Sequence, residues 1–70
     1  MRTKLYAKEL KASDGTILKP GDKVVVTYLS HEQEICTVRK STFENPNHLF
    51  LQDNEAWQID LNSVKKLVLI

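Results

Sequence analysis

Several short stretches of the chain alternate between apolar and polar residues, as strands do when one face of their sheet is buried. The clearest is DKVVVTYL at 22–29, where β-branched residues and one aromatic residue favour extended backbone. The stretch EICTVRKS would place Cys36 and Val38 on one face of a strand and the residues between them on the other. The same pattern predicts further strands at 34–41, 48–53 and 65–70.

The stretch AWQIDL at 56–61 alternates in the same way. We therefore predict that Trp57, Ile59 and Leu61 face the core of the protein and that the residues between them face solvent. The next residues, NSV at 62–64, suit a single helical turn capped by their asparagine or serine.

Two glycines predict tight turns before the clearest strand. Asp14-Gly15 favours a type I′ turn, in which both central residues take positive φ. Pro20-Gly21 favours a type II turn, because proline presets φ at the first central position and glycine supplies the positive φ of the second. Asp22 would cap its own turn by accepting hydrogen bonds from nearby amides. Two polar loops are expected at 30–33 and 42–47.

Residues 1–12 are open to two interpretations. The segment TKLYAKELKA contains good helix formers, but it also alternates as a strand that the Asp14-Gly15 turn would pair with the TIL segment. With a strand here, the chain has about five or six short strands at roughly ten-residue spacing, which is typical of an all-β barrel or sandwich.

The length of 70 residues corresponds to one domain, spanning residues 1–70, with a small core. Cys36 is the single cysteine, so one chain can form neither a disulfide nor a cysteine-based zinc site, and a reducing compartment is expected. The sequence shows no signal-peptide pattern and no apolar run long enough to cross a bilayer. We therefore expect a soluble, cytoplasmic protein without a membrane partner.

The net charge of +1 is too small to indicate non-specific nucleic-acid binding. The charges are nevertheless uneven. Residues 1–12 hold four cations and one acid, a net +3, whereas 44–60 hold four acids and no Lys or Arg, a net −4. Such poles could steer a charged partner, but ordinary scatter over a solvated surface is the favoured explanation.

Two stretches resemble a known architecture. LKPGDKVVV at 18–26 is similar to the strand that opens many SH3-like barrels, including KOW and Tudor-type modules, and DLNSVKKLVL at 60–69 is similar to their end. The resemblance implies an antiparallel SH3-like barrel of five or six short strands, with one 3₁₀ turn before the last strand and Val64 plugging the barrel. It also extends faintly to the barrel half of alkylphosphonate-utilisation-type proteins from bacteria, without their zinc ribbon.

No motif in the sequence indicates catalysis or metal binding. The histidines, His31 and His48, lack H-E-x-x-H spacing, and a chain with two glycines holds no phosphate-binding loop. Cys36 is expected to be a small buried residue rather than a nucleophile. We therefore expect no enzyme, no cofactor and no metal.

The aromatic residues are the candidates for partner binding. Tyr28 ends a strand, Phe43 lies in a polar loop, and Phe50 faces away from its leucine neighbours, so each could contact a protein partner. Two exposed basic pairs, Arg39-Lys40 and Lys65-Lys66, could instead contact phosphates.

The sequence thus favours a small interaction module that binds a protein partner, of the kind found among bacterial accessory or phage proteins. We expect a monomer or a weak homodimer. The alternative is a nucleic-acid-associated barrel of the KOW or Tudor type, with the basic pairs on phosphates and Tyr28 or Phe43 stacking on bases.

Overall fold

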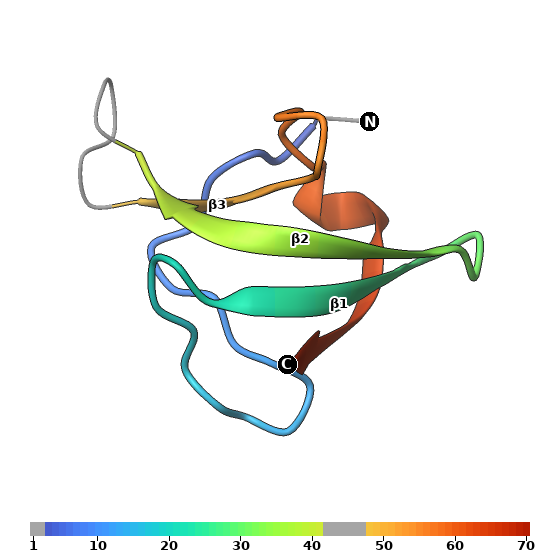
Figure 1. Cartoon of the computed structure of the whole chain (residues 1–70), viewed down its shortest axis with the longest axis horizontal. Helices are drawn as coiled ribbons and strands as arrows, with labels where there is room; N and C mark the ends of the chain where they lie inside the picture. The colour runs from blue at the N-terminus through green and yellow to red at the C-terminus, as the bar shows by residue number, and fades with distance from the viewer. Residues whose placement is uncertain (1–2, 42–47) are drawn as a thin grey trace.

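The computed structural model describes residues 3–41 and 48–70. These residues form one antiparallel sheet of four strands in the order β3-β2-β1-β4, with one 3₁₀ turn, η1, just before β4 (Figure 1). The elements are β1 (Lys23–Tyr28), β2 (Gln33–Lys40), β3 (Leu49–Gln52), η1 (Leu61–Ser63) and β4 (Val64–Leu69). The predicted all-β class is confirmed, but the described chain has four strands rather than five or six, and their ladder does not close on itself.

The two central strands follow the predicted alternation. Val24 pairs with Cys36 in the β1–β2 register, and both side chains are buried, as are Val26 and Val38. The intervening residues point to the other face, as the pattern predicted. The inner face of the sheet therefore supplies the centre of the core, which is made of Leu10, Ala12, Leu18, Val24, Val26, Cys36, Val38, Leu51 and Ile59.

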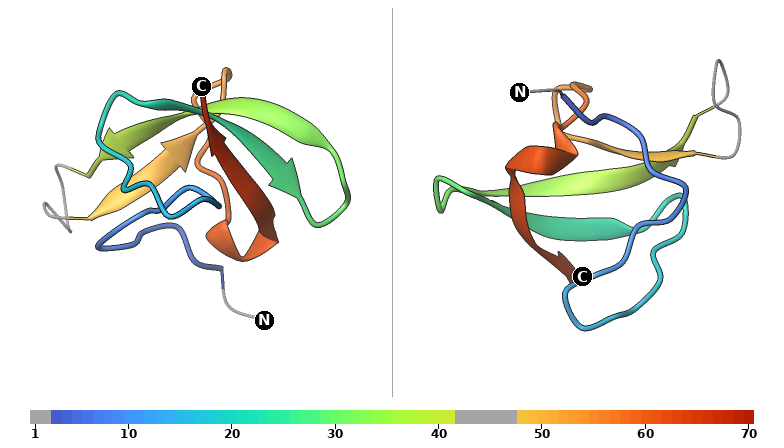
Figure 2. Two further views of the ribbon diagram at one scale, coloured as in Figure 1. Left: turned by 90° about the horizontal axis from the view of Figure 1, so that it is seen from below. Right: turned by 180° about the vertical axis from the view of Figure 1, so that it is seen from behind.

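The segment 3–12, in which helix and strand were both open, is extended in the structure and forms no helix. It lies across the open side of the sheet and touches both of its edges (Figure 2). Ala7 exchanges two backbone hydrogen bonds with Leu49 of β3, and Ser13 donates from its backbone N–H to the carbonyl of Leu67 in β4. Ala7 with Leu49 is an isolated bridge, and Ser13 with Leu67 is a single hydrogen bond, so neither contact extends into a ladder. Leu10 and Ala12, two residues apart, both turn inward to the core.

The first predicted turn is present with a different geometry. The amide of Gly15 donates to the carbonyl of Ala12, so the central residues are Ser13 and Asp14, and among them and Gly15 only the glycine has positive φ, at 92°. This is a longer loop with glycine at the left-handed position, not a type I′ turn. The TIL segment after it forms one isolated bridge, Lys11 with Ile17, rather than a strand.

The Pro20-Gly21 turn matches the prediction. The amide of Asp22 donates to the carbonyl of Lys19 over 3.0 Å, and Gly21 has φ of 95°. The Asp22 carboxylate accepts from the Lys19 amide at 2.9 Å, so this residue does cap its own turn. The helical turn near 62–64 also exists, but its cap is Asp60, whose carboxylate accepts from the amide of Asn62.

Candidate functional site

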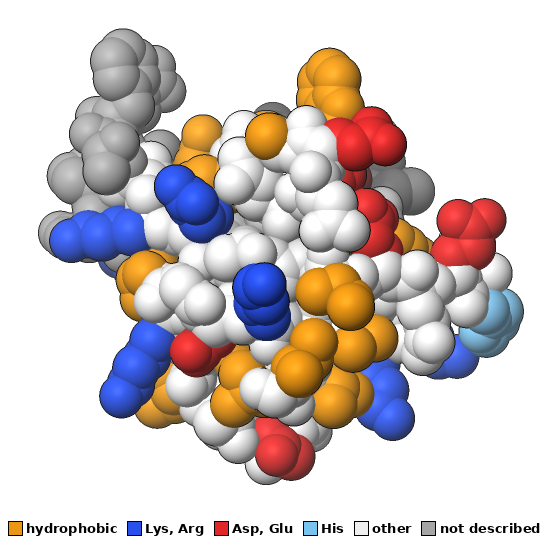
Figure 3. Space-filling view, in the orientation of Figure 1, with side chains coloured by type: hydrophobic (Ala, Val, Ile, Leu, Met, Phe, Trp, Pro, Cys, Tyr) orange, Lys and Arg blue, Asp and Glu red, His pale blue; other side chains and the backbone are white. Residues whose placement is uncertain are grey.

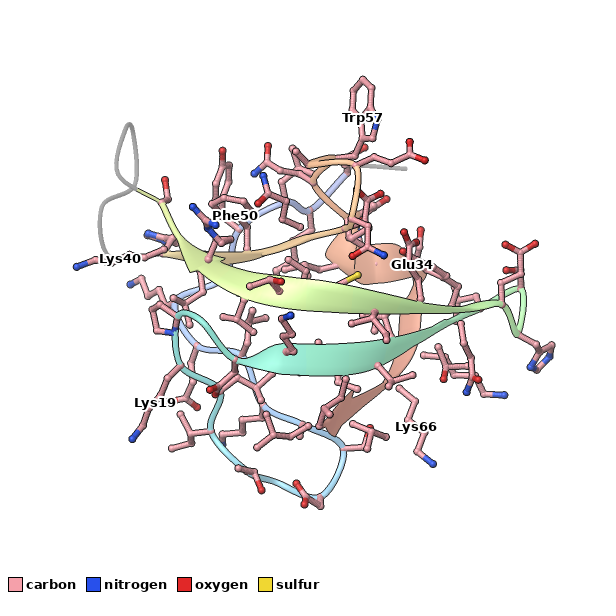
Figure 4. All side chains as sticks on the ribbon, viewed as in Figure 1. Lys19, Glu34, Lys40, Phe50, Trp57 and Lys66 are labelled. Carbon is pink, nitrogen blue, oxygen red and sulfur yellow. The ribbon has the colours of Figure 1, made fainter. Side chains whose placement is uncertain are left out.

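Trp57 lies on the surface with 68% of its area exposed, so the prediction that it belongs to the core is wrong. The alternation at 56–61 is real only in part. Ile59 donates its amide to the carbonyl of Leu51 and is buried, and Leu61 packs at the edge of the core. Trp57 pairs instead with Asp53, one step beyond the end of β3, where no core remains to cover its ring. Figure 4 shows the indole projecting away from the ribbon.

The turn that carries Trp57 is built by one carboxylate. Oδ1 of Asp53 accepts from the backbone amides of Glu55 and Trp57, each over 2.9 Å. The Asp53 amide donates to the Trp57 carbonyl over 3.0 Å, and Ala56 holds a left-handed φ of 66°. Asp53 therefore fixes both ends of the segment 53–57, and Trp57 is presented on a closed turn rather than on a loose loop.

Two surface hollows lie next to Gln58, the residue after Trp57, which lines both of them. Ala56 of the turn lines the second hollow, and Trp57 itself lines neither. The first hollow has a volume of about 480 Å³ and is lined by Tyr28, Leu29, Ser30, Glu32, Gln58, Ile59, Asp60 and Ser63. The second has a volume of about 400 Å³ and is lined by Tyr6, Arg39, Lys40, Ser41, Phe50, Gln52, Ala56 and Gln58. The turn at 53–57 and its two hollows together form the candidate site.

The second hollow contains Phe50, a candidate for binding a protein partner, and Arg39 and Lys40, candidates for binding nucleic acid. Phe50 is half-buried, and its ring meets that of Tyr6 edge to face, with centroids 5.9 Å apart and planes at 78°. Arg39 and Lys40 extend from the end of β2 beside it. The hollow therefore combines an aromatic wall with two cations. Tyr6 was not singled out from the sequence, because the ambiguous segment around it gave no sign that it would lie against β3.

Tyr28 lines the first hollow, but it is partly buried and packs against the core. Its hydroxyl donates to Oε2 of Glu34 over 2.8 Å. Burial, and then the hydrogen bond to Glu34, raise the pKa of Tyr28 above its ordinary value. The neighbouring Leu29 is 61% exposed and offers the apolar contact on this side of the turn.

The two basic pairs do not lie together in one cluster. Lys40 and Lys66 lie on opposite sides of the molecule (Figure 4). Lys65 places its ammonium 3.5 Å from Nδ1 of His31 at the β1–β2 hairpin, remote from the end of β2 that carries Arg39. Phe43, the remaining candidate, lies outside the described residues.

The described residues contain no group of three or more His, Cys, Asp or Glu side chains placed to hold a metal ion. Cys36 is 1% exposed, and burial, with a further contribution from the charge of Glu34, raises its pKa to about 11. The thiol is therefore neutral at physiological pH and shielded from reagents. No helix in the described part of the chain is long and apolar enough to cross a membrane.

Comparison with known proteins gave no match to a family model, to a curated protein or to a solved structure.

Proposed function

We propose that the chain is a non-enzymatic interaction module that binds a protein partner, with Trp57 as the central contact. The carrying observation is that a tryptophan with 68% of its area exposed stands on a turn held by two hydrogen bonds to one carboxylate. A large aromatic side chain in water is an unused source of binding free energy, and tryptophan is among the residues most enriched at interface hot spots.

The surroundings of Trp57 support this role. Because the turn at 53–57 is already fixed, binding would cost little ordering of the backbone. The hollow on one side offers Leu29, and the hollow on the other offers the ring of Phe50. An extended segment of a partner could lie across the turn and place a side chain in each hollow.

At the level of the fold, we propose a small barrel of the SH3-like kind. Its support is the path of residues 3–13, which bond to β3 through Ala7 and to β4 through Ser13, the two opposite edges of the sheet. A segment in that position could close the barrel as a strand would, although it forms only a few hydrogen bonds with the two edge strands. The placement of η1 directly before β4 is consistent with the same architecture.

A nucleic-acid ligand is the second candidate, favoured by one observation. The hollow with Tyr6 and Phe50 also contains Arg39 and Lys40, a combination suited to a base and a phosphate. It would be a short contact, because Lys65 and Lys66 do not line this hollow. Salt separates the two candidates, since binding to phosphates weakens steeply with ionic strength and apolar contacts do not.

The test is capture of partners from a lysate of the source cells with the tagged protein, at low and high salt, with and without nuclease. The wild type is compared with Trp57→Ala and with Ile17→Ala. Ile17 is a matched control because it is also a large exposed apolar residue, at 55%, on a loop at the opposite end of the molecule (Figure 1). Any captured protein is then purified, and its affinity for the wild type and for each of the two variants is measured.

A protein that resists salt and nuclease, and that binds Trp57→Ala about 30-fold more weakly while binding Ile17→Ala normally, supports the proposal. Equal binding by all three chains contradicts the role of Trp57. Capture that disappears with nuclease or salt replaces the proposal with the nucleic-acid candidate, and Arg39 and Lys40 become the residues to change.

A further inference from the structure

The outer face of the sheet carries a continuous aliphatic row across three strands. Val25 of β1 pairs with Ile35 of β2 on one side and with Val68 of β4 on the other. Paired residues in a sheet point to the same face, so the three side chains lie next to one another. Ile35 is 47% exposed and Val68 is 44% exposed. Hydrophobic side chains gather at this place on the surface (Figure 3).

The charged side chains that the strands place on this face are all basic. Lys23 and Lys66 each lie two residues from a member of the row, on β1 and β4, and so share its face. Arg39 lies on the same face farther along β2. The other strand residues of this face in the described chain are uncharged: Thr27, Gln33, Thr37, Phe50 and Gln52. An aliphatic row flanked by cations therefore faces solvent, and Glu34, the carboxylate within these strands, pairs with the buried Val26 and so lies on the other face.

We propose that this face is a second docking surface, for a protein segment in which aliphatic side chains stand among carboxylates. Aliphatic groups would cover Val25, Ile35 and Val68, and the carboxylates would meet Lys23 and Lys66. The inference goes beyond the proposed function and does not rest on it, because Val25, Ile35, Val68, Lys23 and Lys66 line neither hollow. Arg39, Phe50 and Gln52, at the far end of the face, do line the second hollow and are no part of the proposed contact.

The charge and the side-chain types of this face favour an acidic, apolar protein segment over a second copy of the chain and over nucleic acid. A second copy stacked face to face would set Lys23 and Lys66 against cations of its own kind, with no carboxylate among the strand residues of this face to lie between them. Nucleic acid would satisfy the lysines, but branched aliphatic side chains give bases no flat ring on which to stack. An acidic, apolar protein segment satisfies both parts of the face.

The experiment follows the backbone amides of the intact chain by NMR during titration with capped peptides of about ten residues, a common strand length. One peptide alternates valine and glutamate, and the other alternates valine and lysine. A short DNA duplex is the third probe. The variants are Ile35→Thr, which keeps a β-branched residue in the strand, and Lys66→Glu. Lys19→Glu is the control, because it makes the same charge change outside the strands, on the opposite side of the view from Lys66 (Figure 4).

We expect the valine–glutamate peptide to shift the amides of Val25, Ile35 and Val68, and the valine–lysine peptide to leave them unchanged. Ile35→Thr and Lys66→Glu should each weaken the binding about fivefold, and Lys19→Glu should change it less than twofold. The proposal is overturned if the acidic peptide leaves these amides unmoved, if the DNA shifts them more strongly, or if the chain dimerises through them. The shifts of Trp57 are followed in the same spectra, so the outcome for this face is separate from the outcome for the turn.

Discussion

Replacing Asp53 by alanine removes the side chain that closes the turn beneath Trp57. Oδ1 of Asp53 accepts two backbone amides, at 2.9 Å each, and alanine accepts neither. Water can reach this turn, so the loss resembles that of a helix cap, about 1–2 kcal/mol, rather than that of two buried bonds. In a domain of this size, each kcal/mol lowers the melting temperature by about 4–8 °C. We therefore expect a fall of about 4–16 °C.

Thermal unfolding followed by circular dichroism measures this fall, and Trp57, the single tryptophan, reports the turn itself. Its fluorescence anisotropy should decrease in Asp53→Ala, because the indole then stands on a freer segment. Asp53→Asn is the matched control, since an amide oxygen still accepts hydrogen bonds. A melting temperature within about 2 °C of the parent, with unchanged anisotropy, would show that Asp53 does not hold the turn.

Three further predictions concern titratable groups. Hydrogen bonds from Thr16, chiefly from its backbone amide, lower the pKa of Asp14 below 3.8, so its stabilising contribution is present above about pH 4 and is lost as the pH falls further. In Asp14→Asn, the urea midpoint of unfolding should therefore fall less steeply as the pH drops below about 4. A fall as steep as that of the parent would contradict this. The raised pKa of Tyr28 stabilises the fold below about pH 10 and ceases to do so as the pH rises, so Tyr28→Phe should flatten the alkaline slope, leaving the part due to Cys36. Because Cys36 is 1% exposed and has its pKa raised to about 11, it should resist a disulfide reagent in the native protein and react once urea unfolds the chain; rapid native reaction would place it nearer the surface.

Local patterns in the sequence were sufficient for the central strands. The β-branched alternation at 22–29 and 34–41 predicted β1, β2 and the burial of Cys36 and Val38, because a period of two permits a strand to bury only one face. The Pro20-Gly21 turn followed from residues that restrict their own φ. The pattern also predicted a helical turn before the last strand, although it did not identify Asp60 as the cap.

Tertiary structure decided the candidate site. The alternation at 56–61 could not show where this segment pairs with β3. Ile59 pairs with Leu51 inside β3 and is buried, whereas Trp57 pairs with Asp53, beyond the end of β3, and is exposed. Long-range pairing likewise placed Tyr6 against Phe50.

The same pairing separated the two basic pairs and joined Val25, Ile35 and Val68 into one row on the outer face. Hydrophobic periodicity reports which face of a segment is apolar. Whether that face is covered depends on where the neighbouring strands end, and this is set by contacts between residues far apart in the sequence.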